Sequence, residues 1–163
     1  SSPDSGTCFK IFLPDYGKAV TEDAAGHETQ KQTTGHETIL LVEDEEAILT
    51  ITAMMLEAAG YRVITTSSPV EAIKTARSGQ YKIHLLLADV VMPAMNGKEL
   101  AEKLKEFLPE LKYIFMSGYT SDIIPPQNSA EEGLNFLAKP FNSEELTRKV
   151  REVLDQKANS TAD

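Results

Sequence analysis

The sequence predicts an α/β protein with a doubly wound, five-stranded parallel sheet. From residue 38 to about residue 156, short apolar runs alternate with segments whose apolar residues recur at helical spacing. Five strands that alternate with helices require right-handed crossovers, which place helices on both faces of the sheet. The length of 163 residues fits one domain of about 100–150 residues with extensions, rather than two full domains. We therefore predict a single α/β domain over residues 38–156.

The first predicted strand and helix lie at residues 39–42 and 45–59. The strand is the continuous apolar run Ile-Leu-Leu-Val, which is typical of a strand covered on both faces. In the helix the apolar residues recur at helical spacing, and Gly60 stands where a C-terminal cap is expected. The residues expected on its buried face are Ile48, Ile51, Met55 and Leu56 or Ala59.

The remaining elements continue the alternation. Ser68 and Pro69 are residue types preferred at a helix start, Ser as the N-cap and Pro in the first turn. Asn142 and Glu145 have the spacing of a capping box at the start of the last helix. We predict strands over residues 62–66, 83–88, 111–116 and 135–138, and helices over residues 68–79, 97–107 and from 142 or 143 to about 156.

Two segments of different character precede the domain. Residues 8–13 alternate in the manner of a strand, but a strand of this length cannot bury its apolar face alone. We interpret residues 1–14 as the last strand of a preceding domain. Residues 15–37 are polar and without a periodic pattern, and the tetrapeptide Gly-His-Glu-Thr occurs at 26–29 and again at 35–38. This composition indicates a flexible linker.

Composition limits the classes of function. A formal net charge of -9 argues against nucleic acid as a ligand, because phosphate backbones need clustered lysine and arginine. No apolar run reaches the roughly 18 residues that cross a bilayer, so we expect no membrane contact. The single cysteine, Cys8, excludes an internal disulfide framework and fits a reducing, cytoplasmic environment. Residues 157–163 are predicted to be a disordered tail, and residues 8–13 offer a strand edge through which a homodimer could form.

Polar side chains follow four of the predicted strands. Glu43 and Asp44 follow the first strand, Asp89 the third, Ser117 the fourth and Lys139 the fifth. Ligands of doubly wound sheets bind beyond the carboxyl ends of the strands, so these side chains should meet at one rim. Crowded carboxylates favour a hard cation such as Mg²⁺, which completes its shell with water and phosphate oxygens. Each residue alone fits a turn, a cap or a solvated charge, but together they indicate a phosphoryl site with Asp89 as a candidate nucleophile.

Four motifs between residues 39 and 155 resemble the receiver domains of two-component signalling. They occur in the family's order and at its spacing, and together they are highly specific. The resemblance covers nearly three-quarters of the chain and implies the flavodoxin-like (βα)5 receiver fold. The motifs are Leu41-Val42-Glu43-Asp44-Glu45, Asp89 followed by Met92-Pro93-Ala94-Met95-Asn96-Gly97, Met116-Ser117-Gly118, and Lys139-Pro140-Phe141.

The resemblance implies a phosphoacceptor site with a metal ion. Asp89 would accept a phosphoryl group from a phosphohistidine of a histidine kinase or of a histidine phosphotransfer domain. Mg²⁺ would be held by Glu43, Asp44, Asp89 and the backbone carbonyl of Val91. Phosphoryl transfer needs positioning and charge neutralisation more than covalent chemistry from the protein, and the residues agree with that requirement.

The resemblance also implies a conformational switch. Ser117 and Lys139 would hold the phosphoryl oxygens, and Ser117 and Phe136 would be the switch residues that move when the acceptor is phosphorylated. Phe136 stands where a tyrosine would offer a phenolic hydroxyl to an output partner, so that contact is lost. The alternative is that Phe136 is an ordinary core residue of a strand.

Two further positions depart from the family's pattern. Ile124-Pro125-Pro126 removes amide donors and clashes with a preceding helical turn, so a fourth helix should be short, displaced or partly unwound. The usual dimer surface, built on helix four, strand five and helix five, is therefore in doubt. Val91 is apolar where a polar group could orient an attacking water, and we expect slow hydrolysis of the acyl phosphate.

Residues 5–14 resemble the end of a histidine-kinase ATP-binding domain, where a Gly-Thr-x-Phe strand precedes a linker. The whole chain then resembles the C-terminal part of a hybrid sensor histidine kinase, a parent protein that could be membrane-anchored. The boxes that bind ATP are absent, and the two linker histidines, His27 and His36, form neither a metal site nor a phosphoacceptor motif. His84 is expected inside a strand. This piece should have no kinase active site, and its status as an enzyme stays open, with only Mg²⁺-dependent self-phosphorylation and slow autodephosphorylation expected.

Three alternatives remain at this point. A stand-alone response regulator has the same site, but only a short polar tail follows the last helix and no DNA-binding domain appears. A flavodoxin-like electron carrier would need a Ser/Thr/Gly-rich loop after the first strand, whereas Glu43-Asp44-Glu45-Glu46 would repel a flavin phosphate. A phosphatase of the haloacid dehalogenase type would carry its nucleophile on the first strand with a second Asp two residues later, which Glu45-Glu46 does not match.

Overall fold

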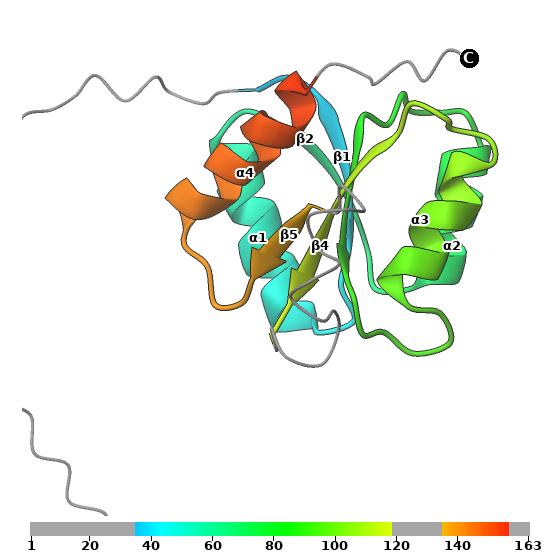
Figure 1. The fold of residues 1–163 in the computed structure, drawn as a ribbon, viewed down its shortest axis with the longest axis horizontal. Helices are drawn as coiled ribbons and strands as arrows, with labels where there is room; N and C mark the ends of the chain where they lie inside the picture. The colour runs from blue at the N-terminus through cyan, green and yellow to red at the C-terminus, as the bar shows by residue number, and fades with distance from the viewer. Residues whose placement is uncertain (1–34, 119–134, 157–163) are drawn as a thin grey trace, which may run out of the picture. The chain divides into compact units, whose positions relative to one another are not determined.

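The computed structural model describes residues 35–118 and 135–156, and the following account concerns these residues. They form five parallel strands in the order β2-β1-β3-β4-β5, with helices on both faces of the sheet (Figure 1). This order confirms the doubly wound, flavodoxin-like α/β fold. The elements are β1 (Thr38–Val42), α1 (Glu46–Ala58), β2 (Arg62–Thr66), α2 (Pro69–Arg77), β3 (Leu85–Asp89), α3 (Gly97–Lys105), β4 (Lys112–Ser117), β5 (Phe136–Ala138) and α4 (Ser143–Asp155).

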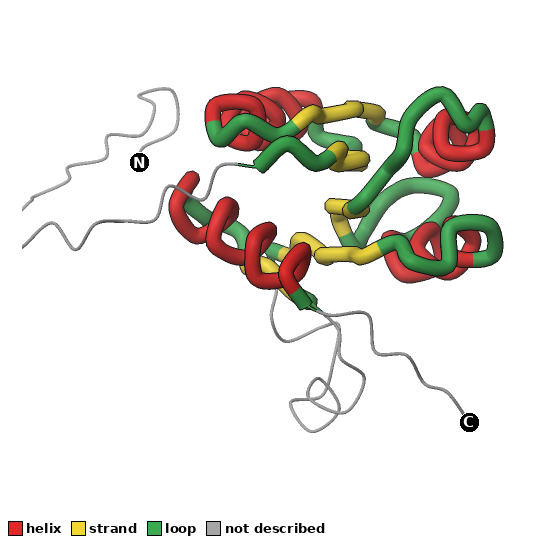
Figure 2. Tube along the Cα trace, turned by 90° about the horizontal axis from the view of Figure 1, so that it is seen from above, coloured by secondary structure: helices red, strands yellow, loops and turns green. Residues whose placement is uncertain are grey.

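Two layers of helices enclose the sheet (Figure 2). Leu40 and Val42 of β1 belong to the core on the side of α2 and α3, while Ile39 and Leu41 belong to the core on the side of α1 and α4. All four side chains are fully buried, which confirms that the apolar run is a strand covered on both faces. Burial of each such side chain stabilises the fold by about 1.5–3 kcal/mol relative to exposure, so β1 anchors the residues that follow it.

The buried face predicted for α1 is partly wrong. Leu56 is fully buried as expected, but Ile51 is 54 % exposed, and Thr52 and Ala53 are buried instead. Met54, one residue before the predicted Met55, is 64 % exposed. Apolar residues occur on more than one face of this helix, so their spacing alone does not select the face that packs on the sheet. The helix therefore presents apolar side chains to solvent.

Caps account for the ends of several helices. Gly60 has a φ of 91° after α1, which confirms a C-terminal glycine in the left-handed region. The Asn142 side chain accepts from the Glu145 N–H at 2.9 Å, and the Glu145 carboxylate accepts from the Asn142 N–H at 3.0 Å, which confirms the capping box. Ser68 precedes α2, but its side chain makes no capping hydrogen bond. Its N–H instead donates to the Thr66 hydroxyl at 3.1 Å.

His84 lies just before β3 and not inside a strand. The predicted strand over 83–88 forms at Leu85–Asp89, two residues later at its start. The His84 Nδ1 accepts from the Thr38 N–H at 3.0 Å, and the His84 N–H donates to the Thr38 carbonyl at 2.9 Å. His84 thus ties the start of β1 to the start of β3, a role that polarity patterns do not reveal.

Several predictions fall outside the described residues and stay predictions. They concern the strand at 8–13, the linker up to residue 34, the segment around Pro125-Pro126 and the tail at 157–163. Across the parts of the chain that the structure describes, no helix combines the length and apolarity that a bilayer span requires.

Candidate functional site

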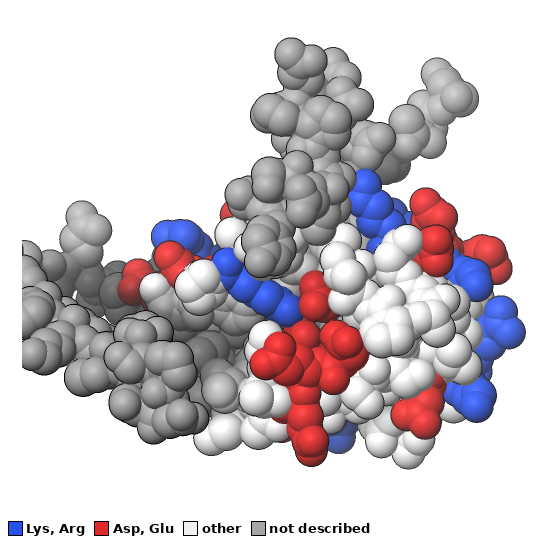
Figure 3. Space-filling model, turned by 90° about the horizontal axis from the view of Figure 1, so that it is seen from below, with Lys and Arg blue, Asp and Glu red and all other residues white. Residues whose placement is uncertain are grey.

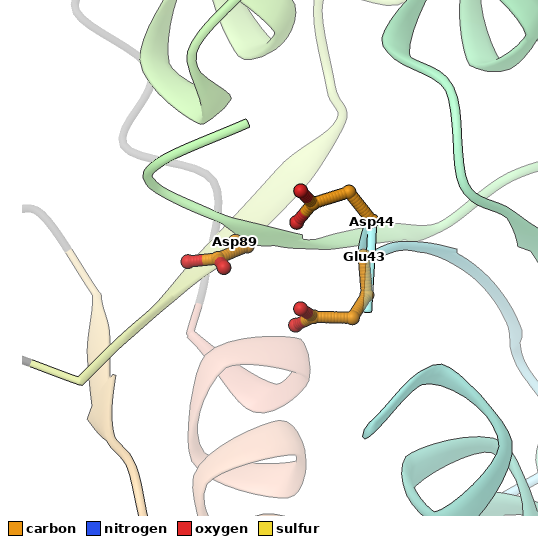
Figure 4. A group of neighbouring side chains, drawn as sticks. All are labelled: Glu43, Asp44 and Asp89. Carbon is orange, nitrogen blue, oxygen red and sulfur yellow. The ribbon is translucent and has the colours of Figure 1, made fainter. Parts of the chain in front are cut away.

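The candidate site lies at the carboxyl ends of β1 and β3. The chain passes from β1 outward to β2 and returns to β3 on the other side of β1, so the direction of winding reverses between these two strands. Glu43 and Asp44 directly follow β1, and Asp89 is the last residue of β3. One carboxylate oxygen from each of the three lies within 4.8 Å of the others, and the side chains point toward a common space (Figure 4). The structure thus brings together the three predicted acids.

The three acids differ in their access to solvent. Glu43 is 1 % exposed, whereas Asp44 is exposed and Asp89 is half-buried. Figure 3 shows this face of the molecule, where acidic side chains gather beside basic ones. A small ligand can therefore reach Asp89 and Asp44 from solvent, with Glu43 forming the floor of the site.

Lys139 completes the cluster with a positive charge. Its Nζ donates to the Glu43 Oε2 at 2.6 Å and to the Asp89 Oδ2 at 3.1 Å, and its side chain is 15 % exposed. Burial alone would lower the pKa of Lys139, but the hydrogen bonds to the two carboxylates outweigh burial and raise it. The lysine is therefore a fixed cation at neutral pH, placed as the sequence predicts.

Burial raises the pKa of the Glu43 carboxyl above its ordinary value, although the hydrogen bond and charge of Lys139 lower it. The nearby Asp89 also raises this pKa, because like charges disfavour a second ionisation. Burial and Asp89 thus raise the pKa of Glu43, Lys139 lowers it, and the net shift is upward. A cation that approached all three carboxylates would favour their ionised forms together.

Ser117 and Lys139 are linked through the backbone. Ser117 ends β4 and is 8 % exposed, and its carbonyl accepts from the Lys139 N–H at 2.8 Å. Phe136, the first residue of β5, is half-buried against the core on the side of α2 and α3. Its ring centroid lies 5.7 Å from that of Phe115. Phe136 is therefore a partly exposed extension of the core, next to the site.

The loop after Asp89 is held by backbone contacts. The Val90 N–H donates to the Met116 carbonyl at 3.0 Å, and the Gly97 N–H donates to the Val90 carbonyl at 3.0 Å. A Cβ at Gly97 would lie 2.3 Å from the Asp89 carbonyl oxygen, so only glycine fits this approach. Val91 is 70 % exposed, and its N–H donates to the Asp89 Oδ1 at 3.4 Å. The predicted metal contact of the Val91 carbonyl stays a prediction.

Ala94 in this loop has a φ of 69°, in the region that disfavours residues with a Cβ. We expect Ala94→Gly to raise the free energy of unfolding by about 1 kcal/mol, because glycine adopts this conformation without strain. Urea unfolding of both proteins measures the change. Ala58→Gly, at the exposed end of α1, is the control and should act in the opposite direction. A lower stability of Ala94→Gly would contradict this account.

An apolar groove beside the site was not predicted. It has a volume of about 360 Å³ and lies between α1 and the loop that follows β5. The only sequence signal for this groove was that α1 carries more apolar residues than one buried face needs. From the sequence, those residues were expected on the face that packs on the sheet. Its lining includes Ile48, Ile51, Met55, Lys139, Pro140 and Phe141.

Comparisons with known proteins agree on one family. The sequence pattern of the response regulator receiver domain matches residues 39–151. The chain is 35 % identical to sensor kinase CckA of Brucella abortus over 96 % of its own length, but it spans only 17 % of that protein. It is 33 % identical to the response regulator receiver protein CpdR of Brucella abortus, of which it covers 95 %. The crystal structure of the receiver domain from hybrid histidine kinase CckA matches with a TM-score of 0.60 and 33 % identity, covering 72 % of this chain and 98 % of that one.

Proposed function

The chain belongs to the response regulator receiver domain family of two-component signalling, and on that premise we propose that Asp89 is a phosphoacceptor. The observation that carries the proposal is the cluster itself: three carboxylates within 4.8 Å of one another, with the Lys139 ammonium bonded to Asp89 and Glu43. Lys139 offsets part of the negative charge around one accessible oxygen nucleophile, and a cation held by the three carboxylates would offset the rest, which is what phosphoryl transfer requires.

The proposed step moves a phosphoryl group from a phosphohistidine to Asp89. A carboxylate oxygen of Asp89 bonds to phosphorus, the phosphorus–nitrogen bond breaks, and its electron pair stays on the imidazole nitrogen of the donor. The product is an aspartyl phosphate. Lys139 holds one phosphoryl oxygen by its charge, and the Ser117 hydroxyl donates a hydrogen bond to another, which draws the end of β4 toward the site.

The donor set of the rim fits Mg²⁺. The three clustered groups all offer carboxylate oxygens, the ligand type that this ion prefers. We propose that Glu43, Asp44 and Asp89 hold it, together with the Val91 carbonyl. When bound, the ion supplies charge neutralisation and orients the phosphoryl oxygens.

The apolar groove supports a protein as the phosphodonor. A partner that brings its phosphohistidine to Asp89 must rest on the surface around the rim, and the groove adjoins Lys139. Ile51 and Met54 of α1 are also exposed, and they continue this apolar surface away from the site. We propose that a histidine kinase or histidine phosphotransfer domain packs apolar side chains there.

The parent protein is proposed to be a hybrid sensor histidine kinase. The similarity to the sensor kinase extends over 96 % of this chain, more than the residues 39–151 that match the receiver pattern. This supports residues 1–14 as the end of a kinase ATP-binding domain and residues 15–37 as the linker, in a cytoplasmic part of the protein. A stand-alone response regulator is the alternative, whereas no observation favours the electron carrier or the phosphatase.

Val91 is expected to slow the loss of the phosphoryl group. Its exposed apolar side chain, two residues after Asp89, gives an attacking water no polar partner. Val91→Asn should speed hydrolysis of the aspartyl phosphate about tenfold, which corresponds to about 1.4 kcal/mol of barrier. Decay of the phosphorylated protein, followed by mass spectrometry, measures the rate. Val70→Asn, at a valine of α2 that is 46 % exposed, should leave it unchanged, and an equal acceleration by both would refute the role of Val91.

Beryllofluoride, which mimics a phosphoryl group on a carboxylate, tests the proposed function. In the presence of Mg²⁺ it should shift the amide resonances of Ser117 and Lys139 in wild type. Asp89→Asn should abolish these shifts, because the amide cannot coordinate beryllium as the carboxylate does. A wild-type spectrum without any Asp89-dependent change would rule out the phosphoacceptor role.

A further inference from the structure

The residues just before β1 pack closely against the domain, although their composition indicates a linker. The Gly35 N–H donates to the Ala59 carbonyl at 3.1 Å, and the Glu37 carbonyl accepts from the Arg62 N–H at 3.0 Å. Gly35 lies so near the Tyr61 ring that an added Cβ would be 1.9 Å from its Cε1. One of these hydrogen bonds is with the residue before the turn between α1 and β2, and the other is with the first residue after it. Position 35 requires glycine, because a Cβ there would collide with the Tyr61 ring.

The side chain of Glu37 reaches a different element, α4. Its Oε1 lies 2.9 Å from the Arg151 Nη2, and the two side chains are only 16 % and 24 % exposed. Arg151 also holds Asp155 one turn later, at 2.8 Å. By contrast, the Lys149–Glu152 pair on the same helix leaves its carboxylate 55 % exposed, as is usual for surface pairs of little energetic value.

The surroundings of Glu37 keep it ionised. Burial alone would raise its pKa, but hydrogen bonds from Arg151 and from backbone N–H groups outweigh burial and lower the pKa to about 2. The Tyr61 hydroxyl is buried near the same guanidinium and has no hydrogen bond of acceptable geometry to the described residues. The Glu37–Arg151 pair is thus charged, partly desolvated and close to the Tyr61 hydroxyl.

We propose that Gly35, His36 and Glu37 form a clasp that fastens the incoming linker to the end of α4 and to the turn between α1 and β2. Figure 1 shows the start of β1 beside the end of α4. The five residues of β1 span about 16 Å, so the clasp lies at the opposite end of the strand from Glu43. Residues 35–37 therefore cover neither Asp89 nor the groove.

The clasp also joins the linker to the helix that follows the site. α4 begins at Ser143, directly after the loop that carries Lys139, Pro140 and Phe141. A pull or twist on the linker therefore acts on α4 through Arg151, and not only on the first residue of the sheet. Residues 35–37 thus contact the domain, although their composition indicates a linker.

Hydrogen exchange and ¹⁵N relaxation of the whole chain test the clasp. The Gly35 and Arg62 amides report its two backbone bonds, and the Leu86 amide in the sheet interior reports global stability. In Glu37→Gln and in Arg151→Met, exchange at Gly35 and Arg62 should accelerate at least tenfold relative to Leu86. The order parameter of His36 should fall from about 0.85 to below about 0.6. The double variant should be no looser than the looser single variant.

Two controls separate the clasp from general effects of charge. Glu28 lies in the identical tetrapeptide Gly26-His27-Glu28-Thr29, so Glu28→Gln makes the same chemical change outside the clasp and should alter nothing. Asp155→Asn removes the other partner of Arg151 and should leave Gly35 and Arg62 protected. Unchanged exchange in Glu37→Gln, equal loosening by either control, or additive effects of the two clasp variants would each overturn the proposal.

Discussion

Lys139→Met is expected to abolish the response of Ser117 to beryllofluoride while Mg²⁺ still binds. Methionine keeps much of the side-chain length but removes the ammonium that bonds Glu43 and Asp89. Without the ammonium, the bound phosphoryl mimic loses the group that holds one of its oxygens, so it is not positioned to accept the hydrogen bond from Ser117 that draws the end of β4 toward the site. The carboxylates that hold the metal remain, so Mg²⁺ affinity should be retained. Amide shifts of Ser117 and calorimetric titration of Mg²⁺ measure the two effects.

The same substitution should destabilise the protein in the absence of Mg²⁺. Glu43 is 1 % exposed and would lose its ion-pair partner, which costs about 3 kcal/mol for a buried pair that keeps some access to solvent. Added Mg²⁺ should recover most of that loss, and urea unfolding measures it. Lys149→Met, which breaks the exposed pair with Glu152, should cost less than about 0.5 kcal/mol. A collapse of Mg²⁺ affinity in Lys139→Met would contradict the roles assigned to the lysine and the acids.

Asp44→Asn is expected to weaken Mg²⁺ binding about 30-fold, or about 2 kcal/mol, because affinity for hard cations falls with the charge of the ligands. The same change should slightly stabilise the metal-free protein, since it removes one of three mutually repelling carboxylates. Calorimetric titration at fixed pH and ionic strength measures the affinity. The phosphoacceptor itself stays intact, so slow phosphorylation at high Mg²⁺ should persist.

Glu45→Gln is the matched control for this prediction. Glu45 is the next residue in the chain and is exposed, but it does not belong to the carboxylate cluster. Its neutralisation changes the net charge by the same amount and should weaken Mg²⁺ binding less than about twofold through screened, long-range attraction. Equal losses in Asp44→Asn and Glu45→Gln would show that general charge, and not coordination, attracts the ion.

The sheet and the rim follow from the sequence because their causes are local or topological. The short apolar run at 39–42 fits only a strand that is covered on both faces. The caps at Gly60 and Asn142 depend only on residues a few positions away in the chain. Parallel strands also end at a common edge, so residues that follow different strands converge without any knowledge of packing. The sequence alone therefore predicts that Glu43, Asp89 and Lys139 lie together.

What the sequence misses depends on contacts between distant segments. Ile51 is exposed because another face of α1 packs on the sheet. Several faces of this helix are apolar enough to take that place, so the sequence does not show which one does. The pairing of Glu37 with Arg151 joins residues that are far apart in the chain, and the identical tetrapeptide at 26–29 shows that local composition does not reveal it. The role of His84 likewise depends on its hydrogen bond with Thr38, which lies 46 positions earlier in the chain, at the start of the neighbouring strand.

The central claim is that Asp89 becomes phosphorylated in a Mg²⁺-dependent way. Incubation of the full chain with a small acyl phosphate, followed by intact mass and tandem mass spectrometry after borohydride trapping, tests it directly. We predict a single added phosphoryl group in wild type, located at Asp89, which does not form when Mg²⁺ is chelated beforehand and is absent from Asp89→Asn. An unmodified wild-type protein with Mg²⁺ present, or a modification that persists in Asp89→Asn, would contradict the account.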